Sequence, residues 1–418
     1  MTEVVDLPDN VWEMILRLLD GVSLINLSLA SAYYSSLIEE CVDWKDKFQS
    51  IPGRFVEAVT HVSADVPLKG RDPNFYKKFC FHFSALCNID SLGRSYNQSF
   101  FKLNFPTISA TIICCGFLIV GCIDGSVGIF EPKSLHKVKW VARLHSGPIT
   151  ALHCYCRSIF RKFPSTLISA GKDACLKFTR YDKTYLQVDD PWALPLSSEI
   201  TASTKDGRRI LIGQENGDVR LLTIRLDPSE LDEGKQKCTA SVSALYTDTR
   251  RRSVNAVALS NATVAVQVKD STLLVLHVDF KDVPPRLVLV HSFSNFFLHP
   301  SLYLELDFIN GSEVDALSIQ EVLDRTEKAI GGVKRVVAFG PIFICLDVSN
   351  KLFMMTVQNL KDFVLGQKKL DKRMLEIESA VYLDFKSMCF GYTTGGFVLI
   401  LTEMNDGNKV HTSIFQKS

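Results

Sequence analysis

The stretch LISAGKDACLKF, residues 167–178, has a pattern that indicates the fold of most of the chain. An apolar run leads into a turn at Asp173, and apolar residues return three and five positions later, at Leu176 and Phe178. Apolar residues that alternate on either side of a polar turn are typical of a β-hairpin with one buried face. The stretch therefore predicts two neighbouring strands of an antiparallel sheet.

The same pattern recurs along the chain, and each turn is followed by an apolar residue at +3 and another at +5. We expect these apolar side chains to face inward. The turn residues are Asp124, Asp173, Asn216, Asp270, Asn350 and Thr394. The apolar positions are Val127, Leu176, Val219, Leu273, Phe353 and Phe397 at +3, and Ile129, Phe178, Leu221, Val275, Met355 and Leu399 at +5.

The turns lie 49, 43, 54, 80 and 44 residues apart, so the longest interval is close to two of the others. A weaker copy lies inside it, YLELDFINGSEVDALSI at residues 303–319, with a turn at Asn310-Gly311. A period of about 45 residues is typical of propeller blades, which have four strands each and close radially. We expect seven blades, and the fifth has a helical alternative because SIQEVLDRTEKA, residues 318–329, also fits a helix.

Two segments are candidates for the strand that closes the ring. NKVHTSIF, residues 408–415, could supply the last outer strand, and SFFKLNF, residues 99–105, could complete the last blade from the N-terminal side. We favour the N-terminal strand.

Residues 7–20, LPDNVWEMILRLLD, have a helical rather than an alternating pattern. Apolar residues at spacings of three and four continue to Trp44, which predicts three short helices. So small a unit cannot bury all of these large side chains, and surplus apolar surface is usually a docking or packing face. We therefore divide the chain into a small all-α module at 1–48, a structured connector at 49–98 and an all-β propeller at 99–418.

The composition limits the classes of function. Lys and Arg number 47 and Asp and Glu 46, so the net charge of +1 gives no general attraction to nucleic acid or anionic membranes. The longest apolar run, residues 112–123, is too short to cross a bilayer, and the acidic N-terminus is unlike a secretory signal. We expect a cytoplasmic or nuclear protein whose partner is neither a membrane nor a nucleic acid.

Motifs for catalysis or metal binding are not found in the sequence. It contains no phosphate-binding glycine loop, no H-E-x-x-H and no G-x-S-x-G. Its 12 cysteines include no C-x-x-C pair, so we expect reduced thiols that pack in the core rather than a zinc site. The sequence thus predicts a protein that is not an enzyme and that holds no metal and no cofactor.

The N-terminal helices resemble the F-box family. The family pattern fits without a gap on Leu7-Pro8, Ile15-Leu16, the run from Ser23 to Leu37, and Trp44. Where Asp, Val and Trp are common in the family, this chain has Ser23, Ala30 and Tyr34, which keep the capping or apolar character.

This resemblance implies docking onto the SKP-type adaptor of cullin-based ubiquitin ligases, and through the adaptor onto a cullin scaffold. It places the adaptor-binding residues at Leu7, Pro8, Ile15, Leu16, Leu24 and Leu27. The alternative is an ordinary helical cap that packs on its own chain.

The repeats resemble WD repeats in a degraded form. His145, Ser169 and Asp173 match three members of the family's His-Ser-Asp-Trp hydrogen-bonding set. Phe178 stands where Trp is usual and cannot donate a hydrogen bond, so the set is incomplete. The resemblance implies a structural role for His145 and Asp173 rather than a catalytic one.

Propellers with this strand order present two sets of loops on one rim, and several cations of this chain map to that rim. They are Lys172, Arg250, Arg251, Arg252, Lys269, Lys334 and Arg335. Since arginine binds carboxylate and phosphate by paired hydrogen bonds, the rim is a candidate binding site for an acidic or phosphorylated protein. The alternative is a solvated rim, because Asp124, Glu215, Asp270 and Glu313 map to it as well.

Taken together, the two resemblances indicate the F-box/WD-repeat family. They imply a substrate-recognition subunit of an SCF-type ubiquitin ligase, in which the helical module binds the adaptor and the seven-bladed propeller binds the target protein. The alternative is a non-catalytic WD-repeat interaction scaffold with no role in a ligase.

Overall fold

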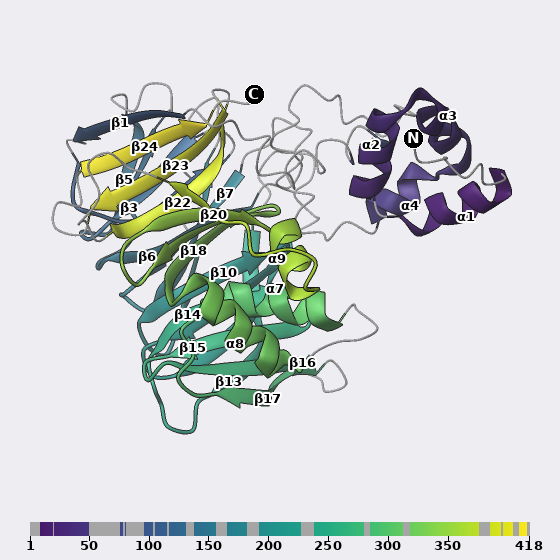
Figure 1. The fold of residues 1–418 in the computed structure, drawn as a ribbon. Coiled ribbons are helices and arrows are strands. Elements are labelled where there is room, and N and C mark those ends of the chain that lie inside the picture. Colours follow the sequence, from purple (N-terminus) through teal and green to yellow (C-terminus); the bar gives the residue numbers. More distant parts are fainter. Residues whose placement is uncertain are drawn as a thin grey trace.

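The structure is a computed structural model, in which a helical lobe is followed by antiparallel sheets arranged as a propeller (Figure 1). It describes residues 9–19, 21–49, 76–77, 80, 96–102, 105–114, 117–130, 138–155, 165–181, 192–226, 238–279, 285–311, 318–375, 385–393, 396–403 and 409–415. Within these ranges, no helix is long and apolar enough to cross a membrane.

Four helices form the N-terminal lobe, one more than the sequence predicts. They are α1 (Asp9–Leu18), α2 (Gly21–Ala30), α3 (Ala32–Cys41) and α4 (Trp44–Gln49). The Lys47 ammonium of α4 donates hydrogen bonds of 2.7 Å to the carbonyl oxygens of Arg17 and Leu19. These carbonyls lie at the C-terminal end of α1, where helix geometry leaves them without a partner, so α4 stabilises the end of α1.

Six four-stranded antiparallel sheets follow in the described residues, whereas the sequence predicts seven. Each sheet is one blade, and five of the six are built from consecutive strands. In chain order these five are β2 (Ile108–Cys114), β3 (Phe117–Cys122), β4 (Ser126–Phe130) and β5 (Val138–Arg143); β6 (Ile149–Tyr155), β7 (Ser165–Gly171), β8 (Cys175–Tyr181) and β9 (Trp192–Pro195); β10 (Ile200–Asp206), β11 (Arg209–Gln214), β12 (Asp218–Leu226) and β13 (Cys238–Thr247); β14 (Val254–Ser260), β15 (Thr263–Val268), β16 (Thr272–Asp279) and β17 (Arg286–Phe293); and β18 (Val333–Phe339), β19 (Ile342–Asp347), β20 (Leu352–Thr356) and β21 (Arg373–Leu375).

The last blade joins the two ends of the propeller. It consists of β22 (Phe385–Thr393), β23 (Gly396–Glu403) and β24 (Lys409–Phe415), with β1 (Tyr96–Lys102) as its outermost strand. β1 pairs antiparallel with β24 from Tyr96 opposite Phe415 to Lys102 opposite Lys409. The expected closure by an N-terminal strand is therefore confirmed, and the C-terminal candidate segment is the strand next to it.

The first strands of neighbouring blades pack against each other around the centre of the ring. In the first three blades, a β-bulge shifts the register near the start of this strand, at Ser109, Thr150 and Thr201. Each hydroxyl donates to a carbonyl oxygen of the second strand in its own blade, over 3.1 to 3.2 Å. The bulges thus keep their polar side chains satisfied while they bend the strand at the same place in each blade.

Two glycines allow successive blades to approach closely. A Cβ atom at Gly121 would collide with Ile149, and one at Gly213 would collide with Val254. Both contacts join the second strand of one blade to the first residue of the next blade. Packing between blades therefore needs a residue without a side chain at these two positions.

The apolar positions predicted from the repeat are buried wherever the structure describes their side chains. At +3 and +5 they are at most 3% exposed, which confirms the inward strand face. Phe397, among the predicted positions, and Thr394, among the predicted turns, lie outside the residues whose side chains are described. Five of the predicted turns lie between the second and third strands of a blade, at Asp124, Asp173, Asn216, Asp270 and Asn350.

The predicted fifth blade is wrong, because the chain forms helices there. α7 (Pro300–Gly311) covers the predicted turn at Asn310-Gly311, and α8 (Ile319–Ile330) follows it. α8 begins with a capping box, in which the Ser318 hydroxyl accepts from the Glu321 N–H and the Glu321 carboxylate accepts from the Ser318 N–H. The helical alternative at residues 318–329 is thus the correct one.

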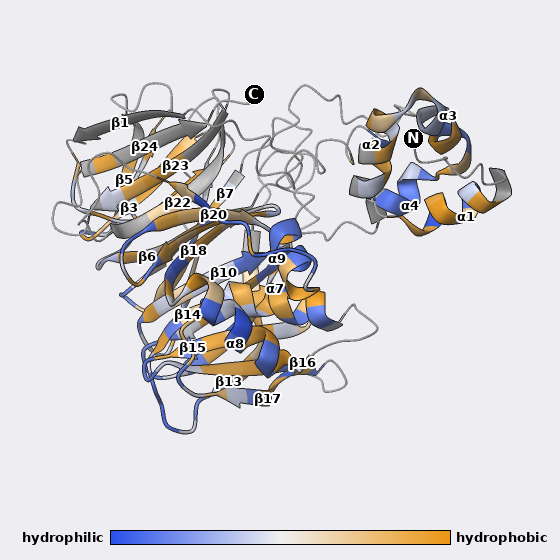
Figure 2. Cartoon of the chain, viewed as in Figure 1, coloured by the Kyte–Doolittle hydropathy of each residue, from blue (hydrophilic) through white to orange (hydrophobic). Residues whose placement is uncertain are grey.

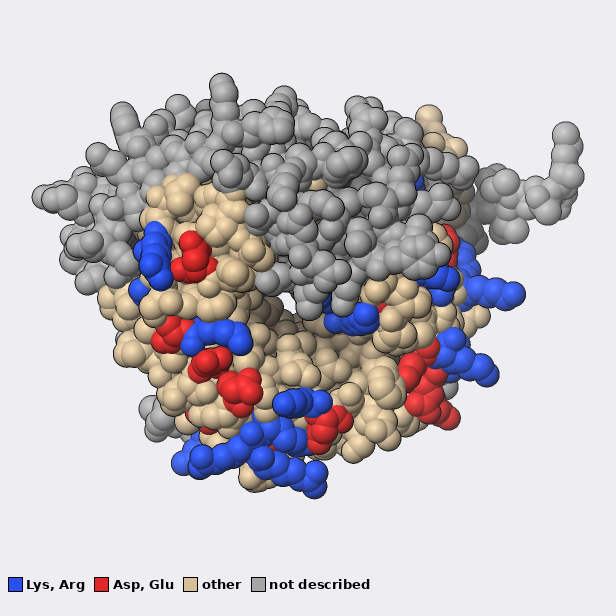
Figure 3. Space-filling model, turned by 90° about the vertical axis from the view of Figure 1, so that its left-hand side faces the viewer, with Lys and Arg blue, Asp and Glu red and all other residues tan. Residues whose placement is uncertain are grey.

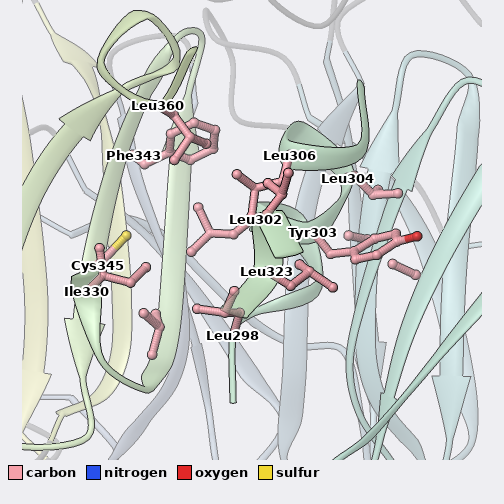
Figure 4. Close-up of a cluster of buried hydrophobic side chains, with 14 of the residues drawn as sticks. Leu298, Leu302, Tyr303, Leu304, Leu306, Leu323, Ile330, Phe343, Cys345 and Leu360 are labelled. Carbon is pink, nitrogen blue, oxygen red and sulfur yellow. The ribbon is translucent and has the colours of Figure 1, made fainter. Parts of the chain in front are cut away.

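Between the β14–β17 and β18–β21 blades, α7 takes up the place of the missing sheet. Leu302, Tyr303 and Leu306 of α7 are at most 1% exposed and belong to one cluster with Phe343 and Cys345 of β19 (Figure 4). Figure 2 shows α7 as largely hydrophobic, whereas α8 has hydrophilic residues along its length. A third helix, α9 (Val357–Val364), follows β20 and packs against α7.

Candidate functional site

The helical lobe has a core of its own, and the structure places two predicted adaptor-binding residues inside it. Leu16 and Leu24 are fully buried, so in this conformation they hold the helices together and present no surface to a partner. Ile15 and Leu27 are half-buried, while Leu7 and Pro8 lie outside the described residues. The sequence shows which residues are apolar, but the packing of α3 against α1 and α2 decides which of them are covered.

Other apolar side chains of the lobe are exposed. Met14 and Leu18 are 67% and 86% exposed and lie one turn apart on α1, so they share a face of that helix. Leu29 at the end of α2 is 70% exposed and Tyr33 at the start of α3 is 53% exposed. The surplus apolar surface expected from the sequence is present at these four residues, which the sequence interpretation did not select.

One of the predicted rim cations, Arg252, is already hydrogen-bonded to other residues of the propeller. The Arg252 guanidinium donates to both carboxylate oxygens of Asp248, to Asp270 at 2.8 Å and to the Thr272 hydroxyl. Hydrogen bonds from Thr272 and then from Arg252 lower the pKa of Asp270 to about 2, and the Arg252 hydrogen bonds also lower the pKa of Asp248. Arg252 therefore connects loops of its own blade rather than serving as a cation offered to a ligand.

The remaining predicted cations fall into two groups. Lys172, Lys334 and Arg335 line a central cavity of about 1060 Å³, whereas Arg250, Arg251 and Lys269 are exposed and do not line it. The Lys172 ammonium lies 3.6 Å from a carboxylate oxygen of Glu199, and the Lys334 ammonium donates to the Asn350 side chain at 2.7 Å. The structure thus brings together only part of the predicted set.

Exposed apolar side chains accompany the three cavity cations, and sequence reasoning missed them. Ile123 is 42% exposed and lines the same cavity. Phe297 and Val348 are 48% and 59% exposed, and both lie beside Gly332, which directly precedes β18. Ile123 and Val348 are apolar residues in turns, where polar residues are usual. This departure from the usual turn composition is the feature by which the sequence could have revealed them.

His145 and Asp173 form the structural network that the WD resemblance implies. The ring of His145 is 2.8 Å from the Asp173 carboxylate through Nδ1 and 2.8 Å from the Ser169 hydroxyl through Nε2. Burial lowers the pKa of His145, which favours the neutral ring. For Asp173, burial acts to raise the pKa, but hydrogen bonds from His145 and from the Ser146 N–H outweigh it and lower the pKa.

Phe178 replaces the usual tryptophan of that network and packs in the core instead. It is 3% exposed, and its ring centroid lies 5.1 Å from that of Trp192. The blade therefore gains an aromatic contact at the point where the hydrogen-bonded set is incomplete.

The wall of the cavity carries a polar pair that the sequence did not reveal. His153 of β6 and Ser203 of β10 lie in neighbouring blades, and the His153 Nε2 is 2.7 Å from the Ser203 hydroxyl. Burial, followed by the charge of Lys205, lowers the pKa of His153 to about 3. In the described residues, no group of three or more His, Cys, Asp and Glu side chains is arranged to hold a metal ion.

A comparison with protein families supports the N-terminal assignment. A family model described as F-box domain matches residues 5–46. The chain therefore carries an F-box domain, and a β-propeller follows it.

Comparisons with individual proteins give weaker likenesses. No curated protein matches this chain. Among solved structures, it is similar to the β-propeller domain of Cps50 (Swd1) from Myceliophteria thermophila, with 14% identity, a TM-score of 0.39 and coverage of 77% of this chain and 100% of that chain. It is also similar to Raptor from Chaetomium thermophilum, with 10% identity, a TM-score of 0.40 and coverage of 77% of this chain and 29% of that chain. The designed protein Ika4 matches with 16% identity, a TM-score of 0.30 and coverage of 42% and 93%.

Proposed function

We propose that this chain is a substrate-recognition subunit of an SCF-type ubiquitin ligase. The F-box domain at residues 5–46 carries the proposal, because F-box domains generally bind SKP-type adaptors. In this proposal, the adaptor connects the chain to a cullin scaffold, and the propeller holds the target protein. The complex acts in the cytoplasm or the nucleus.

The exposed apolar residues of the helical lobe support adaptor docking. Met14, Leu18, Leu29 and Tyr33 leave large side chains exposed on a lobe that has a buried core of other residues. Burying such side chains contributes about 25 cal/mol for each Å² of apolar surface, so a partner that covers them gains binding energy. These four residues are therefore the docking surface that we propose, together with Ile15 and Leu27.

The mouth of the central cavity supports a role for the propeller in binding the target. Lys172, Lys334 and Arg335 provide positive charge there, and Ile123 provides exposed apolar surface. A target segment that combines an acidic or phosphorylated residue with a large apolar side chain would match both features.

The chain in this proposal binds and positions, while the bond-forming chemistry takes place on a partner enzyme. The His153–Ser203 pair has the residue types of a nucleophile and its base. A histidine whose pKa is about 3 is a weak base at neutral pH, so this pair is poorly suited to activate a hydroxyl group.

The direct test is binding of the full chain to a purified SKP-type adaptor by isothermal titration calorimetry. We expect submicromolar affinity, and we expect Leu18→Asp and Leu29→Asp each to weaken it about tenfold or more, as is typical of buried interface anchors. The double substitution Leu7→Ala/Pro8→Ala tests the adaptor-binding role that the F-box pattern implies for these two residues, and we expect it to weaken adaptor binding as well. Arg17→Ala is the matched control, because Arg17 is an exposed neighbour whose ion pair with Glu13 is local to α1.

The outcome separates this proposal from its alternative. If a folded, monodisperse chain does not bind the adaptor, the ligase role is contradicted. The function would then be that of a non-catalytic interaction propeller, with the helices as an appended module.

A further inference from the structure

The outermost strands of the blades differ in how well their free edges are protected. Native sheets protect an open edge with short strands, charged side chains, proline or bulges, because the edge offers backbone hydrogen-bonding groups to any other strand. Two of the outermost strands, β9 and β21, have only four and three residues. A third, β5, contains Lys139 and Arg143. These three edges therefore carry common forms of protection.

The edge of β17 has much less protection. β17 has eight residues, and Arg286 at its first position is its one Lys, Arg, Asp or Glu. The three consecutive residues Val288, Leu289 and Val290 are 48%, 43% and 52% exposed. In the described residues, no strand pairs with β17 on the side away from β16. This edge is therefore both apolar and open.

The neighbouring outermost strand, β13, widens the apolar surface. β13 packs against β17, and the two strands lie next to each other at the lower end of the propeller in Figure 1. Val242 and Leu245 of β13 are 44% and 46% exposed, and the ten residues of β13 include no Lys, Arg, Asp or Glu. We call the five exposed side chains of the two strands the outer patch. They are Val242, Leu245, Val288, Leu289 and Val290.

The outer patch is separate from the central cavity. The cavity is lined mainly by the first strands of the blades and by the start of α7, where His299 lies, and no residue of β13 or β17 lines it. Figure 3 shows the hollow at the centre of one face, with side chains of both charges around it. A partner bound to the outer patch would therefore leave the mouth of the cavity accessible.

The charges near the edge favour a second copy of this chain as the partner. Arg286 lies opposite Asp279 of β16 in the register of the sheet, so a charge of opposite sign accompanies it. The remainder of β17 contains no Lys, Arg, Asp or Glu, and the whole chain has a net charge of only +1. Two copies can therefore approach without the repulsion that keeps highly charged proteins apart.

The geometry of β17 is compatible with pairing to itself. A bulge at Val290 interrupts the ladder with β16, so the regular part of the edge ends at Leu289. Residues that lie opposite each other in antiparallel strands point to the same face of the sheet, so a two-fold axis between two copies has to pass through a residue. Val288 is at the centre of residues 287–289. With the axis there, each Val288 faces Val288 of the second copy, and the two Arg286 side chains lie on opposite sides of the axis.

We propose that the β17 edge pairs with β17 of a second copy of this chain, so that the two β14–β17 sheets continue into each other about a two-fold axis. Backbone hydrogen bonds join the two edges, and the outer patch supplies the apolar centre of the interface. A standard interface has about 20–30 residues a side, so we expect this small contact to give a Kd in the micromolar range. The inference is separate from the proposed ligase function and does not depend on it.

Sedimentation velocity of the full chain at several micromolar concentrations measures the dimer directly. We expect an equilibrium of monomer and dimer without larger species, because a two-fold contact closes on itself. Val288→Lys brings two like charges together at the axis, and it should weaken dimerisation about tenfold or more. Val141→Lys is the matched control, since Val141 is 49% exposed on β5, the outermost strand of another blade.

A pair of variants with opposite charges identifies the second copy as the partner. Val288→Lys and Val288→Glu should each be monomeric at a concentration at which the unchanged chain dimerises, whereas their equal mixture should form dimers, because opposite charges then meet across the axis. The proposal is overturned if the mixture is no more dimeric than either variant alone. It is also overturned if the unchanged chain stays monomeric, which would leave the edge to an extended segment of another protein, or if it forms open-ended aggregates.

Amide hydrogen exchange provides an independent readout of the strand pairing. Amide hydrogens within residues 287–289 should exchange more slowly at high than at low protein concentration, because new backbone hydrogen bonds protect them. Those of β5 should exchange equally at both concentrations. A dimer without this protection would contradict the proposal, since it would rest on apolar contact alone. Adaptor binding should be the same for Val288→Lys and the unchanged chain, so the two proposals are tested separately.

Discussion

At the scale of single residues, different side chains perform one task in successive blades. A residue two to four positions before the first strand of a blade contacts an acid at or next to the turn between the second and third strands, as His145 does with Asp173 and Ser197 with Asp218 at 2.9 Å. Arg252 does the same with Asp270. The task is to join two loops of one blade, and the chemistry of the joining residue varies.

This explains why Arg252 cannot be assigned from sequence alone. In the sequence it is one of three consecutive arginines, and nothing distinguishes it from Arg250 and Arg251. Its three acceptors lie 4, 18 and 20 residues away and become neighbours only when the blade forms. The sequence places all seven cations in loops of one rim, whereas Lys334 and Arg335 lie within β18. Which of the cations remain available for a ligand depends on tertiary pairing.

The two cavity histidines predict how stability depends on pH. The folded-state pKa values of about 3 for His153 and about 4 for His299 lie below the ordinary value of 6.5. Below pH 6.5 the unfolded chain takes up protons that the folded chain does not, so the free energy of unfolding decreases on acidification. Between pH 7 and pH 5 we expect a loss of roughly 1 to 2 kcal/mol for each histidine.

Urea denaturation at several pH values above 4.5 measures this effect, in a range where most carboxylates remain ionised. His153→Gln retains an amide at the position of Nε2, and it should flatten the pH dependence. His277→Gln, at an exposed site on β16, should not. An equal pH slope in His153→Gln and the unchanged chain would contradict the assignment.

At the scale of secondary structure, α7 lies where a blade was predicted. The prediction failed because the sequence of α7 fits the two-residue period of a strand as well as the 3.6-residue period of a helix. Leu302, Leu304 and Leu306 alternate as in a strand, while Leu302, Leu306 and Ile309 follow the spacing of a helix. Tertiary packing favours the helix, since β14, β15 and α8 all pack against α7. Strand pairs elsewhere were predictable because a turn residue fixed both their position and their register.

The packing of α7 predicts a large effect of a core substitution. Leu302 is fully buried in the cluster that joins the β14–β17 and β18–β21 blades. Leu302→Ala should lower the free energy of unfolding by about 2 to 5 kcal/mol, because it leaves a cavity that the rigid sheets cannot fill. Urea denaturation monitored by circular dichroism gives this value.

The same helix offers a matched control. Phe308 is 49% exposed on α7, so Phe308→Ala should cost roughly 1 kcal/mol or less. Equal effects of the two substitutions would mean that α7 is not the structural replacement for a blade.

At the scale of the whole molecule, the ring depends on a strand from far away in the sequence. β1 is the outermost strand of the last blade and pairs along its full length with β24. Without β1, β24 becomes an edge strand with unpaired backbone groups. The helices of the lobe, by contrast, precede β1 in the sequence and contribute no strand to the described blades.

Two truncations test this dependence. Removal of residues 1–95 retains β1, whereas removal of residues 1–102 deletes it. We expect amide hydrogens of residues 409–415 to exchange much faster in the second variant, and its Tm to be several degrees lower, about 2–4 °C for each kcal/mol lost. The same protection in both variants would show that β1 is not needed for closure.

The pairing of β1 with β24 also sets a delay during synthesis. More than 300 residues separate Lys102 from Lys409, and the ribosome adds about 5–20 residues per second, so the partner of β1 emerges roughly 15 to 60 seconds after β1 itself. During this time β1 has an unsatisfied edge beside a growing set of finished blades. Folding of this propeller is therefore completed only after β24 has been synthesised, and until then its first strand is open to pairing with a strand of another chain.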